Sequence, residues 1–278
     1  MEIETISQKY DWLAFTVPFY KDLQWPDYIK TDWKAVTPLA HFSEGLENVQ
    51  GIRVYWHKTR PQMGKHVIVS GSSLAGIQDK ATDFLAHIVG SGYKVTRIDF
   101  AVDIMYSDFN PRNASYHIEK RQVKTHATKS PKWADAMADG YTQYIGKKTS
   151  EAYTRVYDKG AEMGVNFRWV RVETVYQGER ALPAAKTYLQ CGDCRALVRA
   201  HVDFPRWKKW MYVMETDTVK VATVYKQSNT RNWLLEQVTK SLAKEMTLDD
   251  DQEFYLIFLQ RVREEYLRLT SNKDDVNF

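Results

Sequence analysis

The chain has 278 residues, 44% of them hydrophobic, which is enough for one large domain or two small ones. Its 39 lysines and arginines outnumber its 35 aspartates and glutamates, so a polyanionic partner is permitted but not required. The sequence has no signal-peptide pattern and no apolar run that could cross a bilayer, which predicts a cytoplasmic protein with no membrane partner. Cys191 and Cys194 stand alone in CGDC, and we interpret them as incidental thiols rather than a zinc or redox site.

The first half of the chain begins with strand-like segments. Asp11–Val17 is apolar and is followed by Pro18, which is typical of a strand. Gly51–Trp56 and Lys65–Ser70 predict two further strands, and the proline and glycine between them predict the turn of a hairpin. Residues 19–50 show no sustained periodicity, so we expect them to be irregular, with room for one short helix.

Helical spacings then alternate with a strand. Ser72–Val89 has apolar residues three and four apart and is followed by Gly90, which predicts a helix. Lys94–Ile104 predicts a strand, and Asp108–Gln122 predicts a helix with proline in its first turn. A helical pattern also covers Arg180–Ala200. This order predicts an α+β fold with a mainly antiparallel sheet, helices on one face and the active site on the other.

The C-terminal part of the sequence has a different character. Thr230–Met246 and Asp250–Leu269 are long and amphipathic, which predicts a helical pair. The last residues are polar, so we expect a flexible tail. The predicted organisation is a catalytic sheet domain at 1–215, a C-terminal helical region at 216–270 and the tail at 271–278.

Three of the predicted strands repeat one pattern. Because side chains alternate between the faces of a strand, each has an apolar face and a face that carries arginine with aspartate, glutamate or tyrosine. If the three strands pair in one sheet, their charged side chains converge on one surface. The residues on that surface are Arg97, Asp99 and Asp103 in the first strand, Arg155, Tyr157 and Lys159 in the second, and Arg171 and Glu173 in the third.

Such a surface suits metal-assisted phosphoryl transfer, because carboxylates hold a hard cation and cations hold phosphate. The pattern alone fits equally well with three ordinary half-buried strands that are joined by cross-strand ion pairs. Both interpretations remain open at this level.

Two other stretches are candidates for contact with nucleic acid. Cations dominate between Arg112 and Lys132; such a run is usually a solvated face, but it lies between two of the charged strands and could follow a phosphate backbone. Phe204–Val213 interleaves cations with tryptophans, which suits unpaired bases, although tryptophans are more often core or lid residues. The candidate DNA-binding residues are Arg97, Arg171, Lys120, Arg121, Lys124, Arg206, Trp207, Lys208 and Lys209.

Four runs occur together in this chain: RIDFAVD (Arg97–Asp103), YIGKKTS followed by RVYDKGAE (Tyr144–Glu162), WVRVE (Trp169–Glu173) and NWLLEQV (Asn232–Val238). In this order, and with HVIVSG (His66–Gly71) before them, they resemble the replication initiation factor family. That family contains rolling-circle initiators of plasmids, their filamentous-phage relatives and some relaxases of conjugative elements. The resemblance covers roughly residues 11–246.

The resemblance implies an enzyme that nicks one strand of origin DNA and rejoins strands by transesterification. Tyr157, the tyrosine of the RVYDK run, would be the nucleophile, giving a 5′-phosphotyrosyl linkage and a free 3′-OH primer. A phenol with a pKa of about 10 is a poor nucleophile at neutral pH. We expect Arg155 and Lys159, on the same face, to favour the phenolate or to hold the phosphate.

A carboxylate-bound metal is expected to assist this chemistry. Mg²⁺ or Mn²⁺ held by Asp99 and Glu173 would polarise the scissile phosphate. Asp103 is a weaker ligand candidate, because four residues along a strand separate it from Asp99 by roughly 13 Å. None of the seven histidines lies two residues from another in the sequence, which favours carboxylate ligands and these ions over zinc.

The resemblance also implies single-stranded or cruciform origin DNA as the substrate, a host helicase as a partner, and a homodimer. A conjugative relaxase would share the same chemistry. A sequence-specific DNA-binding regulator that has lost catalysis is the third hypothesis, and the presence of Tyr157, Asp99 and Glu173 argues against it.

Overall fold

The computed structural model describes residues 5–125, 133–137, 140–222, 240–241, 243–244 and 256–264. The chain forms two compact units, Met1–Val224 and Tyr225–Phe278, so the first unit extends past the boundary that we predicted at residue 215. No helix within the described residues has both the length and the apolar character needed to cross a membrane.

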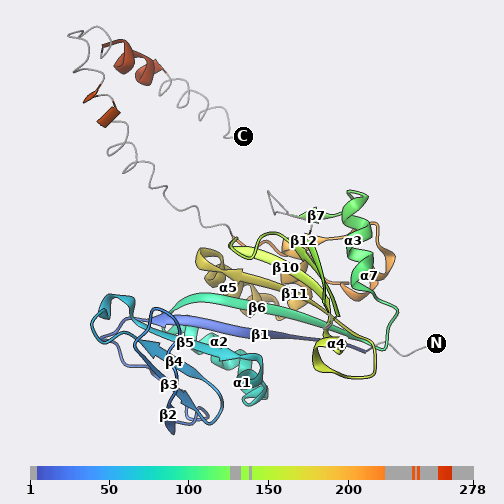
Figure 1. The fold of residues 1–278 in the computed structure, drawn as a ribbon, viewed down its shortest axis with the longest axis horizontal. Helices are drawn as coiled ribbons and strands as arrows, with labels where there is room; N and C mark the ends of the chain where they lie inside the picture. The colour runs from blue at the N-terminus through green and yellow to red at the C-terminus, as the bar shows by residue number, and fades with distance from the viewer. Residues whose placement is uncertain are drawn as a thin grey trace. The chain divides into compact units, whose positions relative to one another are not determined.

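A ten-stranded antiparallel sheet dominates the first unit, in the order β2-β3-β4-β5-β1-β6-β11-β10-β9-β8 (Figure 1). The predicted hairpin is present as the pair β4 and β5. A separate two-stranded sheet joins β7 (Lys124–Thr125) to β12 (Val202–Asp203). The large sheet consists of β1 (Thr5–Val17), β2 (Trp33–Ala35), β3 (Glu44–Asn48), β4 (Arg53–Trp56), β5 (Lys65–Ser70), β6 (Lys94–Met105), β8 (Trp133–Met137), β9 (Gly140–Ile145), β10 (Ala152–Asp158) and β11 (Trp169–Gln177).

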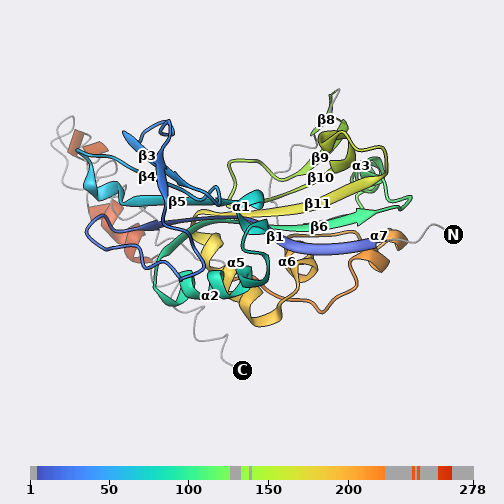
Figure 2. The same ribbon diagram turned by 90° about the horizontal axis from the view of Figure 1, so that it is seen from below.

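Helices pack on one side of this sheet. In Figure 2, α2, α5 and α6 lie together below the sheet, while β3 and β4 at one end and β8 and β9 at the other rise on the opposite side. The predicted α+β fold, with a mainly antiparallel sheet and helices on one face, is confirmed. The helices are α1 (Gly71–Ala75), α2 (Ala81–Gly90), α3 (Pro111–Glu119), α4 (Lys159–Met163), α5 (Ala181–Cys191), α6 (Cys194–His201) and α7 (Lys208–Val213).

The alternation of side chains explains why the helices pack where they do. In β6, Ile98, Phe100 and Val102 point toward the helices and are completely buried. The ring of Phe100 meets Tyr188 of α5 at a centroid distance of 5.3 Å. Each such side chain contributes roughly 1.5–3 kcal/mol by leaving water. The intervening residues of β6 point to the other face, which we call the polar face.

Two predicted helices are each divided in two. The segment 72–89 is interrupted after α1 by Gly76, and the segment 180–200 breaks at Gly192, whose φ of 65° is a left-handed conformation that favours glycine. Asp193 then caps α6 by accepting a hydrogen bond from the Arg195 amide at 2.9 Å. CGDC is therefore a helix junction, and burial raises the pKa of the Cys194 thiol.

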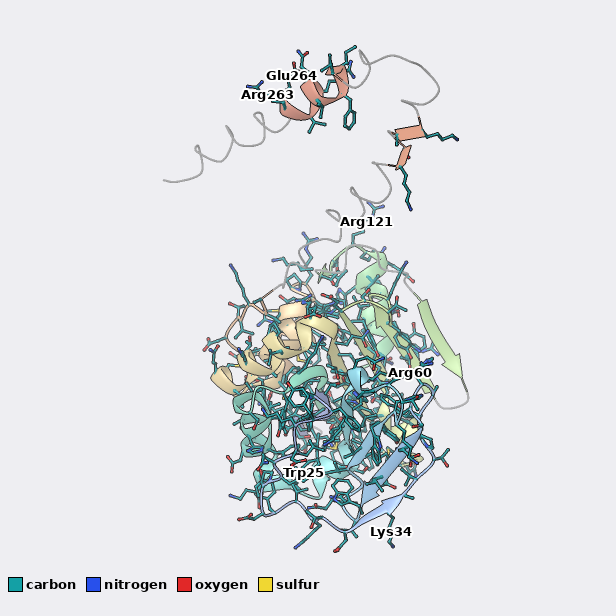
Figure 3. The ribbon with its side chains drawn as sticks, turned by 90° about the vertical axis from the view of Figure 1, so that its left-hand side faces the viewer. Trp25, Lys34, Arg60, Arg121, Arg263 and Glu264 are labelled. Carbon is teal, nitrogen blue, oxygen red and sulfur yellow. The ribbon has the colours of Figure 1, made fainter. Side chains whose placement is uncertain are left out.

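Other boundaries also differ from the predictions. The expectation that residues 19–50 are irregular is wrong, because β2 and β3 lie there and extend the sheet. The first strand starts earlier than Asp11, at Thr5. In the C-terminal unit, residues 240, 241, 243, 244 and 256–264 are helical, and Arg263 and Glu264 are exposed (Figure 3). The rest of the predicted helical pair and the tail at 271–278 lie outside the described residues.

Candidate active site on the polar face

The register of three adjacent strands brings the predicted catalytic and metal-binding residues together. β11 lies between β6 and β10, and pairs Glu173 with Arg155 on one side and Arg171 with Asp103 on the other. Arg171 is also the partner of Tyr157 in β10. The charged side chains of all three strands therefore share the polar face, as the alternation predicted.

Tyr157 is held in this cluster by Glu173. Its hydroxyl donates a hydrogen bond of 3.1 Å to Oε2 of Glu173, and the side chain is only 6% exposed. Burial, followed by the charge of Glu173, raises the pKa of Tyr157, and this outweighs the opposite effect of Arg155 and Arg171. Of the two expected roles of the flanking cations, favouring the phenolate is not supported by this direction of the pKa shift, and holding the phosphate stays a prediction.

Glu173 links the tyrosine to Arg155. Its other oxygen, Oε1, accepts a hydrogen bond of 2.7 Å from the Arg155 guanidinium, whose carbon lies 4.9 Å from the centre of the Tyr157 ring. Within the described residues, Nε of Arg155 is buried and has no hydrogen-bond partner. A buried donor without a partner in this cluster would gain a hydrogen bond from an anion such as a phosphate oxygen.

Asp99 forms a second carboxylate centre on the next strand. Arg97 holds both of its oxygens, through Nε at 2.9 Å and through a terminal nitrogen at 2.6 Å. Burial raises the pKa of Asp99 to about 7 despite Arg97, and the negative charge of Glu173 contributes in the same direction. A cation bound between two carboxylates in a buried site would offset their mutual repulsion.

Asp103 belongs to a different group of contacts. Arg171 donates to both of its oxygens, at 2.7 and 2.8 Å, and the indole Nε1 of Trp169 donates to Oδ1 at 2.7 Å. The third nitrogen of Arg171 donates to Asp11 of β1. Because Arg171 is only 3% exposed and fully occupied by carboxylates, it is a structural residue here, and our expectation that it binds DNA is not supported.

Lys159 reaches the tyrosine from a helix rather than from the strand. β10 ends at Asp158, whose side chain caps α4 by accepting a hydrogen bond from the Ala161 amide at 2.9 Å. The strand that we expected to include Lys159 is therefore one residue shorter. The ammonium of Lys159 lies 5.9 Å from the centre of the Tyr157 ring and pairs with Glu162 at 3.0 Å.

The donor set fits a hard divalent cation at two of the three predicted ligands. Asp99 and Glu173 are neighbours on adjacent strands, whereas Asp103 is engaged by Arg171 and Trp169. Among the described residues, no group of three or more histidine, cysteine, aspartate or glutamate side chains is arranged to hold a metal. One or two carboxylates, with substrate phosphate and water, are the usual ligands of Mg²⁺.

The remaining candidate DNA-binding residues lie on the other side of the sheet. α3 and α7 pack through Ala114, Ile118 and Trp210 into the core beneath β6, β10 and β11. Arg121 is exposed just after α3 (Figure 3). The cations that belong to this side, and not to the polar face, are Lys120, Arg121, Lys124, Arg206, Lys208 and Lys209.

Trp207 does not present its ring for base stacking. It is 5% exposed and is stacked on Phe109, with 4.4 Å between ring centres, and on His117 at 5.4 Å. The alternative that this tryptophan is a core residue is the correct one, because Phe109 and the helix α7 enclose it.

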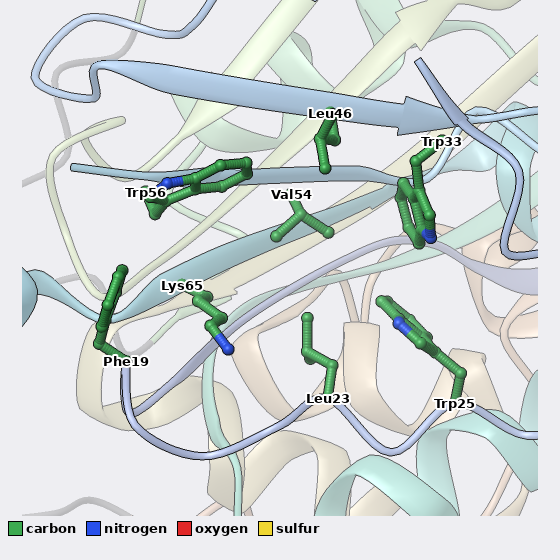
Figure 4. A pocket seen from close by; sticks show the side chains of 8 residues that line it. All are labelled: Phe19, Leu23, Trp25, Trp33, Leu46, Val54, Trp56 and Lys65. Atoms are coloured by element: carbon green, nitrogen blue, oxygen red, sulfur yellow. The ribbon is translucent and has the colours of Figure 1, made fainter. Parts of the chain in front are cut away.

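An apolar cavity of about 350 Å³ lies at the other end of the sheet, where the loop after β1 crosses β4 and β5 (Figure 4). Among the described residues that line it, Lys65 is the only charged one, and none of them is a carboxylate. Its walls are formed by Phe19, Leu23, Trp25, Trp33, Leu46, Val54, Trp56 and Lys65.

The sequence interpretation missed three residues of the polar face. Trp169 follows the same alternation as Arg171 and Glu173, so its position could have been found from the pattern. Asp11 and Trp12 could not, because a β-bulge at Asp11 shifts the register between β1 and β6.

Comparisons with known proteins concern the family and the fold of this chain. Residues 93–257, which include β6, β10 and β11, match the family described as "Replication initiation factor". The fold is similar to the structure of a rolling circle replication initiator protein from Geobacillus stearothermophilus, with a TM-score of 0.59, 17% sequence identity, and coverage of 80% of this chain and 100% of that one. No curated protein matches the chain. Since the family match spans more than half of the sequence, the chain belongs to the replication initiation factor family.

Proposed function

We propose that this protein initiates rolling-circle replication by nicking one strand of its origin DNA, with Tyr157 as the nucleophile. The observation that carries the proposal is the hydrogen bond from the Tyr157 hydroxyl to Glu173, beside the unpaired Nε of Arg155. The nucleophile, a proton acceptor and a hydrogen-bond donor for the phosphate are adjacent on the strands that carry the family match.

In the proposed reaction, the Tyr157 oxygen forms a bond to the scissile phosphorus and the bond from phosphorus to the 3′-oxygen breaks. The phenolic proton passes to Glu173, the released 3′-oxygen takes a proton from water, and the hydroxide so formed removes the proton from Glu173. The products are a 5′-phosphotyrosyl linkage and a 3′-OH that primes synthesis. Attack by such a 3′-OH on the linkage reverses these steps and rejoins the strand.

The raised pKa of Tyr157, together with its hydrogen bond to Glu173, supports a role for Glu173 as the base. A phenol that stays protonated at neutral pH must lose its proton as it attacks, so an adjacent base is needed. Arg155 and Lys159 then act on the phosphate, where they compensate the charge that develops on its oxygens. Their function is to bind the anion and not to ionise the tyrosine in advance.

Mg²⁺ or Mn²⁺ is the proposed cofactor, with Asp99 and Glu173 as its protein ligands. When bound, the ion would act as a Lewis acid on the phosphate oxygens and compensate the repulsion between the two carboxylates. In the present arrangement Arg97 forms an ion pair with Asp99, and Arg155 forms one with Glu173. Arg97 and Arg155 are about one-third exposed, so their side chains can turn toward a phosphate.

The test is incubation with Mg²⁺ or Mn²⁺ and labelled single-stranded oligonucleotides from the protein's own replicon, followed by a denaturing gel. We expect a protein–DNA adduct with the wild-type chain and none with Tyr157→Phe, which removes only the hydroxyl. Glu173→Gln should reduce adduct formation by roughly 10²–10⁴-fold, the usual contribution of a general base. Cleavage by Tyr157→Phe would reject the assigned nucleophile, and DNA binding without any cleavage would favour a regulator.

A further inference from the structure

Trp12 reaches the polar face through an irregularity in β1. Tyr10 pairs with Phe100 and Trp12 pairs with Asp99, which leaves Asp11 as an extra residue between them. The bulge places both Asp11 and Trp12 on the polar face, where Asp11 meets Arg171 and Trp12 meets Arg97. Leu13 then returns to the core.

Two cations lie on the same face as this tryptophan, and one of them stacks on its ring. The guanidinium carbon of Arg97 lies 5.0 Å from the centre of the indole ring, and the Arg97 side chain is 33% exposed. Lys9 lies on the same face, is 49% exposed and pairs with Asp11 at 2.9 Å. Trp12 itself is partly exposed, and its indole N–H has no partner in the part of the chain that the structure describes.

Other tryptophans near the sheet have evident structural roles. Trp169, also on the polar face, is fixed by its hydrogen bond to Asp103, and Trp207 and Trp210 are buried in the core. Trp12 has neither constraint. A partly exposed aromatic ring beside a cation on a charged face is an arrangement that suits unpaired bases, since every base has a π-face and every nucleotide a phosphate.

We propose that Trp12 stacks on an unpaired base of the DNA strand whose phosphate lies at Tyr157. The inference rests on the proposed function and extends it from the scissile phosphate to a base-binding position. β1 lies three strand spacings from β10, roughly 14 Å, so the base belongs to a nucleotide beyond the scissile phosphate. The bulge thus supplies the stacking residue that the sequence suggested at Trp207.

The experiment separates base stacking from phosphate binding. In a Tyr157→Phe background, which cannot form the adduct, affinities are measured by fluorescence anisotropy for two single strands of equal length, oligothymidine and a fully abasic strand. The preference for the strand with bases should fall roughly 5- to 150-fold in Trp12→Ala, the range for one base stacked on one aromatic ring. Trp12→Phe should keep most of the preference. Trp56→Ala, at the cavity at the other end of the sheet, should keep all of it.

The outcomes distinguish the two proposals. An unchanged preference in Trp12→Ala, in a protein that melts at the wild-type temperature, overturns the stacking role even if the wild-type chain nicks DNA. An equal loss of affinity for both strands overturns it too, because the substitution would then have weakened binding to the phosphates, which both strands share, and not to the bases. If Trp12→Ala melts early, the comparison of Trp12→Phe with Trp12→Leu, which keeps apolar volume without a ring, decides between the two results. A reduced preference supports the role, and the adduct assay decides separately whether Tyr157 cleaves.

Discussion

Replacing Arg171 by methionine distinguishes the structural role seen here from the DNA contact that the sequence suggested. Arg171 is 3% exposed and binds Asp103 through two hydrogen bonds and Asp11 through a third. The methionine retains much of the apolar volume and removes every donor. Among the described residues, Asp103 then keeps Trp169 as its partner, and Asp11 keeps Lys9.

The expected cost follows from the burial of these groups. Removing one member of a buried ion pair costs about 3–5 kcal/mol, because the partner's charge stays out of water without compensation. For a unit of this size that corresponds to a decrease in Tm of about 6–20 °C. Differential scanning calorimetry gives the Tm, and anisotropy with single-stranded DNA well below it gives the affinity, which we expect to change less than twofold.

The double variant Arg171→Met with Asp103→Leu is the matched control. It also removes the carboxylate of Asp103, which Arg171→Met leaves buried without its cation, so it should recover most of the lost stability. The reasoning is refuted if Arg171→Met melts like the wild type but binds DNA tenfold more weakly. That result would mean that the guanidinium contacts phosphate and that the buried network contributes little.

The contacts of the polar face lead to three further expected results. The first concerns pH, with a chelator present to remove metal. The pKa of Asp99 is raised to about 7 in the folded chain, so between about pH 4 and about pH 7 the folded state holds a proton that the unfolded state has lost. The contribution of Asp99 to the free energy of unfolding is therefore lost as the pH rises from about 4 to about 7. Asp99→Asn should remove this dependence of stability on pH. Urea unfolding of both proteins measured across this pH range checks it, and the same pH dependence in both would mean that the carboxyl titrates normally. Mg²⁺ or Mn²⁺ at 100 times its Kd should stabilise the wild type by about 2.7 kcal/mol and stabilise Asp99→Asn and Glu173→Gln much less; equal shifts in calorimetry would place the ion elsewhere. Gly71→Ala puts a Cβ 2.5 Å from Oδ1 of Asp11 and should cost about 1–3 kcal/mol in urea unfolding, whereas Gly90→Ala, with no atom within 4 Å, should cost nothing; equal effects would contradict the close packing over Asp11.

The period-2 pattern alone was enough to identify the polar face. Arg97, Asp99, Arg155, Tyr157 and Glu173 share one side of the sheet because alternation in a strand is a local property of the backbone, independent of the rest of the fold. The same rule separated the apolar residues of β6 that bury against the helices. The α+β class and the family also followed from the order of elements and from short runs of residues.

Local patterns could not determine which charged groups neutralise one another. Whether Arg171 faces DNA or Asp103 depends on the pairing of β11 with β6, and Asp11 joins them from a residue 160 positions away in the sequence. The sign of the pKa shift of Tyr157 likewise depends on burial by neighbouring strands, which outweighs the flanking cations visible in the sequence.

The sequence by itself determined the chemistry available to this protein: a tyrosine, carboxylates and arginines at alternating positions of three strands. The tertiary structure decided which of them can act, because burial and register are set by segments distant in the chain. It enclosed Trp207 in the core, engaged Arg171 with two carboxylates, and through one extra residue in β1 turned Trp12 toward the polar face. A single inserted residue reverses the alternation, and only the pairing of strands shows where it lies.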